Sequence, residues 1–487
     1  MTTRMNLARL FQAPVFWPLF ATVVVHIVTW PVVVPAPCND SPFDKSAHRN
    51  PDNQPDADRF FAQAQGIVEG RGPAYDGTID LTLPPGYPAF LSVFLMVGAP
   101  DVLIRLAQVL LSVAGCLLVY ASIRPYSQRW ACLALWILGT CPWLTQRAGE
   151  LLSEALGAFL CACLIACYSY AERRSTYWGS FWLGVVAALL PLVSPFAVFL
   201  SASLLTCFFL MRLRQARLIG AAVCGSLCIF LPWLAYVAKV TTEGTGGLFA
   251  ANYVSLAQKT RFSRFARESF ICESDMGILW NGRGDDFDLS DIPQRAFSSV
   301  AQRRDAQQHV DRYHSGDLSE DGLGNYFEEL RCQRLGERGL QIRLVYPFLR
   351  AVNLWFDMFW PAKLFRARRP DLPWGRSGGM EWPDVAARGW RSLFHQGGFL
   401  KAIYAGGFQI IYASYPVLFL IAVWRAVLAR RMTPLAIFAG ILLYSAFSSA
   451  TCLAESRRNV VFFPAMAFTA AYLSRRRGGP ENATRRS

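Results

Sequence analysis

The stretch PVFWPLFATVVVHIVTWPVVVP, residues 14–35, decides the fold class of this chain. It is an uninterrupted apolar run near the roughly 20 residues that an α-helix needs to cross a bilayer. A short N-terminus with Arg4 and Arg9 precedes it, as in a signal peptide, but the run is longer than the apolar part of a signal and further runs follow. We therefore expect an uncleaved first transmembrane helix.

Similar apolar runs recur along the 487 residues. Hydrophobic residues make up 53% of the sequence and charged residues only 17%, which excludes an ordinary soluble domain. We expect an all-α polytopic membrane protein with about ten spans. The further runs lie at residues 102–122, 129–144, 150–171, 177–190, 193–212, 217–240, 404–426, 434–452 and 459–475.

Basic residues between these runs set the expected orientation, because short cytoplasmic loops are rich in Lys and Arg. With the N-terminus inside, every expected cytoplasmic connection is basic: 124–129, 172–174, 212–217, 425–431 and the tail that begins at Arg475. The chain is therefore expected in the inner or plasma membrane. The formal net charge of +14 then reflects topology, and no nucleic-acid motif accompanies it.

The same reasoning predicts the domain organisation. An N-terminal transmembrane half, 1–240, contains a first external loop at 36–101. An external or interfacial segment follows at 241–400. The C-terminal transmembrane helices occupy 401–475, and a cytoplasmic tail occupies 476–487.

Residues 342–360 are apolar but contain Pro347, Arg350 and Asp357. We expect them on or in the outer interface, because one extra crossing would invert the last three spans and expose their basic loop on the outer side. A pair of crossings would keep the orientation, so the number of spans stays open.

Cysteine and histidine do not form a metal-binding pattern. Most of the 13 cysteines stand singly in apolar runs, where Cys behaves as a small hydrophobe. Outside these runs Cys272 and Cys332 could form a disulfide bridge on the outer side. The five histidines are scattered, so a zinc site is not expected.

The stretch QPDADRFFAQ, residues 54–63, places charge just outside the membrane. A reaction on the outer side has no ATP and needs a pre-activated substrate such as a lipid-phosphate sugar. That chemistry needs a carboxylate base, cations for the leaving phosphate and an apolar groove. In a helix Asp56 and Phe60 share one face and Arg59 lies beside it. Asp56 and Asp58 are therefore candidate catalytic carboxylates. The alternative is a structural role, in which acidic residues in the first turn interact favourably with the helix dipole. An Asp-x-Asp pair is by itself weak evidence for a catalytic site.

Four sequence features in order make this pattern more specific. The first combines Asp56, Phe60, Gly70 and the stretch PPGYP at 84–88. The others are LLSEALGAF at 151–159, LPWLAYVAKVTTEGTGGLFAANYVS at 231–255 and AESRRNVVFFPAMAF at 454–468. Together they resemble membrane glycosyltransferases of the GT-C class, family 39, which includes protein O-mannosyltransferases, lipid A aminoarabinose transferases and related lipopolysaccharide sugar transferases. The resemblance covers the transmembrane half well and residues 260–400 poorly.

The resemblance implies a GT-C-type helix bundle with interfacial helices in its external loops. It also implies Asp56 as the catalytic base and Arg59 as a contact for the lipid phosphate or for Asp56. Some relatives have a Lys before the Pro-Pro pair, whereas this chain has Leu83, so other cations must bind the donor.

Arg457 and Arg458 are the candidates for those cations. They stand in a short external turn where the positive-inside tendency disfavours arginine, and the planar guanidinium suits phosphate. The alternative is that they reach toward lipid headgroups or pair with Glu455. Glu154 could position Asp56 or the acceptor, or could simply cap a helix. No cofactor is required; a divalent cation on Asp56 and Asp58 is an open alternative.

These features predict a glycosyltransferase that moves a hexosyl or pentosyl group from a polyprenyl-phosphate donor to an acceptor hydroxyl of a glycan, lipid or protein, with inversion. A transporter or flippase of a lipid-linked glycan is the alternative. Against it, the ionisable residues gather at one membrane face, and no inverted repeat is evident. A non-catalytic assembly subunit is a third possibility.

Overall fold

The computed structural model describes residues 15–33, 55–75, 78–79, 83–149, 151–242, 265, 268–269, 289, 292, 294–355, 416–428, 431–450 and 461–472. These residues are helical apart from short connections and one antiparallel pair of two-residue strands, β1 (Ala74–Tyr75) and β2 (Thr78–Ile79). The chain forms two compact units. The bundle unit contains Met1–Ala250, Tyr415–Tyr444 and Val460–Ser487, and the hairpin unit contains Ala251–Ser414 and Ser445–Asn459.

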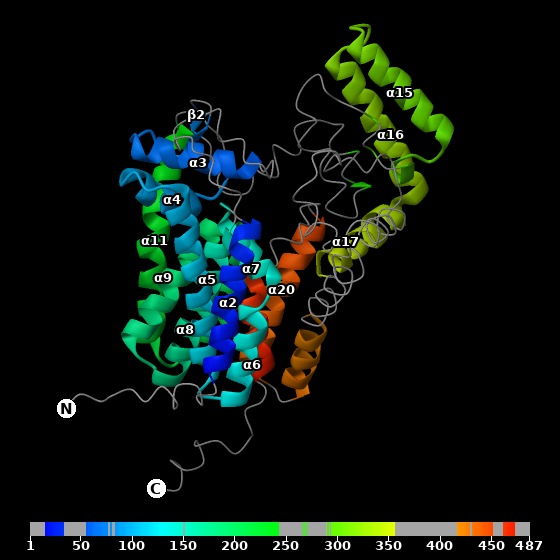
Figure 1. The fold of residues 1–487 in the computed structure, drawn as a ribbon. Coiled ribbons are helices and arrows are strands. Elements are labelled where there is room, and N and C mark those ends of the chain that lie inside the picture. The colour runs from blue at the N-terminus through cyan, green and yellow to red at the C-terminus, as the bar shows by residue number, and fades with distance from the viewer. Residues whose placement is uncertain are drawn as a thin grey trace, which may run out of the picture. The chain divides into compact units, whose positions relative to one another are not determined.

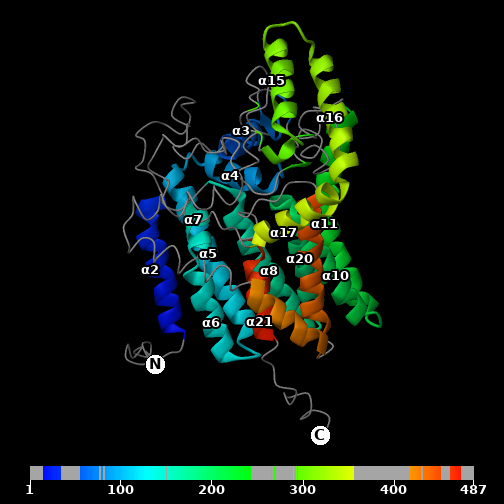
Figure 2. The ribbon, with the colours of Figure 1, turned by 90° about the vertical axis from the view of Figure 1, so that its right-hand side faces the viewer.

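The bundle unit is made of the apolar runs of the sequence (Figures 1 and 2). Its helices are α2 (Phe16–Val33), α5 (Asp101–Ile123), α6 (Gln128–Gly139), α7 (Pro142–Gly149), α8 (Ser153–Arg174), α9 (Tyr177–Val193), α10 (Val198–Met211), α11 (Ala216–Thr242), an apolar helix at Pro416–Leu428, the first part of α20 (Met432–Ala450) and α21 (Phe463–Tyr472). The short 3₁₀ helix η1 (Pro195–Ala197) precedes α10.

Three of the described helices are long and apolar enough to cross a membrane: Asp101–Ile123, Ser153–Arg174 and Ala216–Lys239. They correspond to the predicted runs 102–122, 150–171 and 217–240. Several of the other described apolar helices have only 10–17 residues, so the expectation of about ten spans is not confirmed.

The run 129–144 was expected as one helix but forms two, α6 and α7. The break falls at Thr140 and Cys141, and Pro142 opens the next helix. Proline lacks the N–H that would continue the α-helical ladder, but it fits the first turn of a new helix. The expectation of one continuous helix here is therefore wrong.

Helices α9 and α11 pack with their backbones in close approach. Gly184 of α9 faces the Ala222 carbonyl of α11, and Gly225 of α11 faces the Phe181 carbonyl of α9, with no room for a Cβ atom at either glycine. Small residues of this kind let membrane helices associate closely. The two helices therefore form a tightly joined pair.

At one end of the bundle unit lie the short helices α3 (Pro55–Val68) and α4 (Gly86–Met96), across the ends of the longer helices (Figures 1 and 2). Gly86, the first residue of α4, packs against the backbone of Leu192 near the end of α9. The start of α5 follows α4 closely in the chain. The first loop of the sequence thus forms a helical cover over this end of the bundle.

The connections after α5, α8 and α10 meet at the opposite end of the bundle. The Tyr126 hydroxyl donates to one carboxylate oxygen of Glu172 (3.3 Å), and the Thr433 hydroxyl donates to the other (3.5 Å). Arg212 Nη2 donates to the backbone oxygen of Glu172 (2.7 Å). The Arg173 guanidinium lies 5.9 Å from the centre of the Tyr126 ring. The basic connections 124–129, 172–174 and 212–217 therefore share one end, away from α3 and α4.

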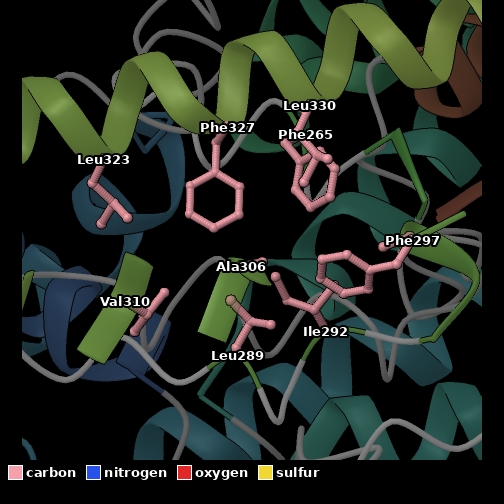
Figure 3. Packing of buried hydrophobic residues seen from close by; sticks show 10 residues of the cluster. Phe265, Leu289, Ile292, Phe297, Ala306, Val310, Leu323, Phe327 and Leu330 are labelled. Carbon is pink, nitrogen blue, oxygen red and sulfur yellow. The ribbon is translucent and has the colours of Figure 1, made fainter. Parts of the chain in front are cut away.

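The hairpin unit contains a pair of helices, α15 (Val300–His314) and α16 (Glu320–Leu340), preceded by a 3₁₀ turn η4 (Gln294–Ala296). Leu323, Phe327 and Leu330 of α16 point toward Ala306 and Val310 of α15 (Figure 3). Other buried members of this core are Phe265, Leu289, Ile292, Ala296 and Phe297. Helix α16 runs on through a π-helical turn, η5 (Gln341–Val345), into α17 (Tyr346–Trp355).

Arg334 of α16 is buried within this core, and its charge is compensated on several sides. Its guanidinium donates to the backbone oxygens of Ala296 (2.9 Å) and Phe265 (3.3 Å) and to the Glu268 carboxylate (3.2 Å). It also lies 4.7 Å from the centre of the Phe265 ring. Burial lowers the pKa of Arg334, while the neighbouring Glu268 opposes that change. Arg334 therefore ties the segment before α15 to α16.

The predicted bridge between Cys272 and Cys332 is not seen. Cys332 is exposed and carries a free thiol, and Cys272 lies outside the described residues. The apolar segment expected at 342–360 corresponds to η5 and α17 as far as residue 355.

Candidate functional site

Helix α3 carries the charged motif of the first loop. It begins at Pro55, so Asp56 belongs to its first turn, and it ends before Gly70, which adopts φ +74°. Proline suits the start of a helix, and glycine takes the left-handed conformation that closes it. A helix is thus present here with the expected start and stop. Its side chains are described from Ala57 onward, so the Asp56 carboxyl group lies outside the described atoms.

Asp58 and Arg59 have different environments although they are neighbours. Asp58 is exposed, whereas Arg59 is 8% exposed. The Arg59 guanidinium lies 5.4 Å from the centre of the Tyr75 ring in β1, an arrangement that favours a cation. The loop that brings Tyr75 back folds tightly on α3, because Gly66 contacts the Gly72 carbonyl with no space for a Cβ atom. The chain segment after α3 therefore holds Arg59 in place.

Phe60 connects α3 to the next helix. Its ring meets the Tyr87 ring of α4 edge to face, with centroids 4.9 Å apart. Tyr87 is fully buried, and its hydroxyl donates to Gln108 Oε1 in α5 (3.4 Å). Gln108 Nε2 in turn donates to the Leu152 backbone oxygen at the start of α8 (3.3 Å). A continuous line of contacts thus runs from Phe60 of α3 through Tyr87 and Gln108 to the start of α8.

Charged groups surround this line of contacts. Arg105 lies one turn before Gln108 in α5, is buried, and donates through Nη1 to the Gly149 backbone oxygen. Glu154, in the first turn of α8, is 6% exposed. Burial raises the pKa of Tyr87 well above its ordinary value, and the negative charge of Glu154 adds to that increase while Arg105 opposes it. Tyr87 therefore stays a neutral hydrogen-bond donor between a buried cation and a buried carboxylate.

A further contact joins this region to α11. Gly72, at φ +80°, packs so closely against the Tyr236 hydroxyl of α11 that no Cβ atom would fit. The Tyr236 ring stacks on Trp233, with centroids 5.6 Å apart. Tyr236 belongs to the stretch 231–255, one of the four sequence features described above. It brings that stretch into contact with the loop after α3.

Some of the predicted site residues lie on helices that the structure connects by contacts. Arg59 and Glu154 belong to helices that the line from Phe60 to Leu152 joins, and Asp58 lies on the exposed side of the same turn of α3. Arg457 and Arg458 lie outside the described residues. Among the residues that the structure describes, no group of three or more His, Cys, Asp and Glu side chains could hold a metal ion.

Sequence reasoning missed Arg105 and Gln108. Both are buried polar residues near the start of an otherwise apolar helix, three positions apart and hence on one side of it. A charged side chain inside an apolar run is costly and so marks a functional or structural role. That signal was present in the stretch DVLIRLAQ, residues 101–108.

Comparison with known proteins finds one family model that matches part of the chain. The model of the dolichyl-phosphate-mannose-protein mannosyltransferase family matches residues 82–236. The match supports a GT-C-type glycosyltransferase. The chain matches no curated protein and no solved structure.

The apolar helices and this family match agree on an integral membrane glycosyltransferase. The matched residues include Tyr87, Arg105, Gln108 and Glu154 and end at Tyr236. They begin after α3, so the match does not cover Asp56 and Arg59, and the roles expected for these two residues stay predictions.

Proposed function

We propose that this chain transfers a sugar from a polyprenyl-phosphate donor to an acceptor hydroxyl at the outer face of the membrane, with inversion at the anomeric carbon. One observation carries the proposal: buried Arg105 and Glu154 gather around Tyr87 at the end of the bundle away from the basic loops, and α3 is joined to them there. The family match supports the donor class.

The basic residues of the connections indicate which end of the bundle faces the cytoplasm. The connections with Arg173, Arg174 and Arg212 share one end of the bundle and suit the cytoplasmic side. Helices α3 and α4 lie at the other end, which then faces outward. A reaction there requires a substrate that already carries an activated bond, and the sugar–phosphate bond of a lipid-linked sugar supplies it.

The proposed step is a single displacement. The acceptor oxygen forms a bond to the anomeric carbon while the bond from that carbon to the phosphate oxygen breaks, and polyprenyl phosphate leaves with the electron pair. Asp56 accepts the proton that the acceptor hydroxyl loses. Cationic side chains offset the charge that develops on the leaving phosphate.

We assign that role to two described cations, Arg59 and Arg105. Both are buried, so their charges act in an environment where electrostatic interactions are stronger than in water. Arg105 stands at the outer end of α5, where it would meet a phosphate at the membrane boundary. Glu154 is the buried carboxylate that would orient the acceptor or the Asp56 turn. Arg457 and Arg458 remain candidates for additional phosphate contacts.

The test compares two neighbouring carboxylates. Asp56→Asn keeps the size of the side chain but removes its ability to take up a proton, so transfer should fall about 10²-fold or more. Asp58→Asn is the matched control on the exposed side of the same turn and should retain most of the activity. The measurement is transfer from a polyprenyl-phosphate sugar by purified protein in liposomes, with folding checked by thermal unfolding. Loss of transfer in Asp58→Asn with activity kept in Asp56→Asn would refute the assignment of the base.

A further inference from the structure

The second half of the hairpin unit displays an apolar surface. Residues Leu340, Leu344 and Phe348 are 73%, 62% and 67% exposed. With Val345, Leu349 and Val352, which are also exposed, they form what we call the apolar face of η5 and α17. The opposite side of the same helical stretch is buried and consists of Ile342, Tyr346, Arg350 and Leu354. The helix is thus apolar on the side that it turns away from its own unit.

The rest of the same unit behaves differently. The exposed positions of α15 are largely polar, with Gln307, Gln308 and Asp311 as examples, and its buried positions are Ala306 and Val310. Among the described residues of the hairpin unit, the exposed large hydrophobic residues all belong to the apolar face except Val300. A helix exposed to water is normally polar outward, as α15 is, so η5 and α17 face a different environment.

The bundle unit shows which environment suits such residues. Leu110 of α5 and Leu227 of α11 are 61% and 45% exposed on helices that are long and apolar enough to cross the membrane. On a helix that crosses the membrane, such outward apolar side chains face lipid. The apolar face has exposures in the same range and lies in a unit that α11 precedes in the chain and α20 follows.

The length of α17 and the charged residues near it indicate how η5 and α17 can contact a bilayer. Helix α17 has 10 residues and spans about 15 Å, roughly half of the hydrocarbon thickness, and it contains Arg350. By itself α17 is therefore too short to cross, and its length suits a position along the interface. Arg343 is the exposed charged residue beside the apolar face, and residues 339–355 contain no Asp or Glu. A basic, acid-free amphipathic helix suits an interface with anionic headgroups.

We propose that the apolar face of η5 and α17 docks the hairpin unit onto the lipid bilayer. Leu344, Phe348 and Val352 enter the acyl-chain boundary, and Arg343 contacts the headgroups. The contact fixes α17 in the plane of the membrane surface. This proposal concerns anchoring and does not depend on the proposed reaction.

Spin labels on the full chain test it. Single cysteines replace Leu344, Phe348 or Val352 in a background without native cysteines, and Gln308→Cys on α15 is the aqueous control. Each labelled protein is reconstituted in liposomes of phosphatidylcholine, and collision rates are measured with oxygen, which concentrates in lipid, and with a nickel chelate, which stays in water. The oxygen-to-nickel ratio should be several-fold higher at the three apolar positions than at Gln308.

Two results would overturn the proposal. A water-like ratio at all three positions would show a solvent-exposed face. Low collision rates with both reagents would show that another protein segment or a second copy covers it. Addition of phosphatidylglycerol should raise the ratio at position 348 further, and Arg343→Gln should abolish that increase; no response to anionic lipid would refute the headgroup contact. Because three separate positions are labelled, failure of one variant to fold leaves the test intact.

Discussion

The Tyr87 hydroxyl donates a hydrogen bond to Gln108 Oε1 across 3.4 Å, and this contact links α4 to the buried polar side of α5. Phe60 of α3 packs on the same tyrosine ring. The position of α3, and with it the turn that carries Asp56, therefore depends on a side chain that would not touch the reacting atoms. We therefore expect Tyr87 to act as a positioning residue in the proposed reaction.

Removal of the Tyr87 hydroxyl should affect the chemical step more than donor binding. In Tyr87→Phe the ring contact with Phe60 stays but the bond to Gln108 is lost. We expect kcat to fall about fivefold with little change in the KM for donor, as for a net hydrogen bond of about 1 kcal/mol. Because burial raises the pKa of Tyr87, the hydroxyl stays protonated through the working range, so the pH profile of transfer should keep its shape. Steady-state kinetics across pH measure both.

Tyr120→Phe is the matched control for this variant. Tyr120 is a buried tyrosine near the other end of α5, and its hydroxyl accepts a hydrogen bond from Gln128 Nε2 (2.8 Å). The change removes a comparable bond far from α3 and should leave kcat unaltered. Equal loss in the two variants would mean that Tyr87 only stabilises the helix bundle.

Arg105 should contribute to donor affinity. Arg105→Lys keeps the charge but loses the planar group that donates to the Gly149 oxygen, whereas Arg105→Gln loses the charge as well. We expect the KM for donor to rise about 10- to 100-fold in the glutamine variant, as for loss of about 1.5–3 kcal/mol, and less in the lysine variant. Kinetics at varied donor concentration measure this.

Arg212→Lys controls for the structural part of that effect. Arg212 donates to the Glu172 backbone oxygen at the opposite end of the bundle, so it makes the same type of arginine-to-carbonyl contact. If Arg212→Lys weakens donor binding as much as Arg105→Lys, the role of Arg105 as a phosphate ligand is disproved.

Lysine and alanine variants can also show whether Arg457 and Arg458 bind the donor phosphate or contact lipid headgroups. If they bind the donor phosphate, the alanine variants should weaken donor binding about 10- to 100-fold and lysine should restore it only in part, since lysine lacks the planar fork. If they reach toward headgroups, lysine should serve as well as arginine. Unchanged donor dependence in Arg457→Lys, Arg458→Lys and both alanine variants would exclude them and leave Arg59 and Arg105 as the cations.

Arg334 should control the stability of the hairpin unit without affecting the reaction directly. Arg334→Met removes the donor to the Ala296 and Phe265 oxygens and leaves the Glu268 carboxylate without one of its partners. Breaking a buried ionic contact commonly costs about 3–5 kcal/mol. We expect faster hydrogen exchange throughout α15 and α16. Arg304→Met, at an exposed position of α15, is the control and should exchange as the wild type does.

The sequence allowed prediction of elements whose signal is local. Apolar runs located α2, α5, α8, α9, α10, α11 and α20, and the pattern of Asp56, Phe60 and Gly70 gave both ends of α3. The split of 129–144 was missed because hydropathy averages over Pro142, although proline changes where a helix can begin.

Other features depend on residues that are distant in the chain. Gln108 meets the Leu152 oxygen, a partner 44 positions away, and the core of the hairpin unit joins Phe265 to Phe297 and Phe327. No spacing rule reveals such pairs. Arg105 was visible in the sequence as a charge within an apolar helix, but its carbonyl partner at Gly149 was not.

The glycine contact between α9 and α11 also has a consequence for biogenesis. Helix α10 separates the two partners in the chain, so Gly184 must wait for Gly225 to leave the ribosome and enter the membrane before their backbones can meet. The contact of Tyr236 with Gly72 depends on the same helix. The loop after α3 is therefore synthesised early, yet it reaches its final surroundings only after α11 has been made.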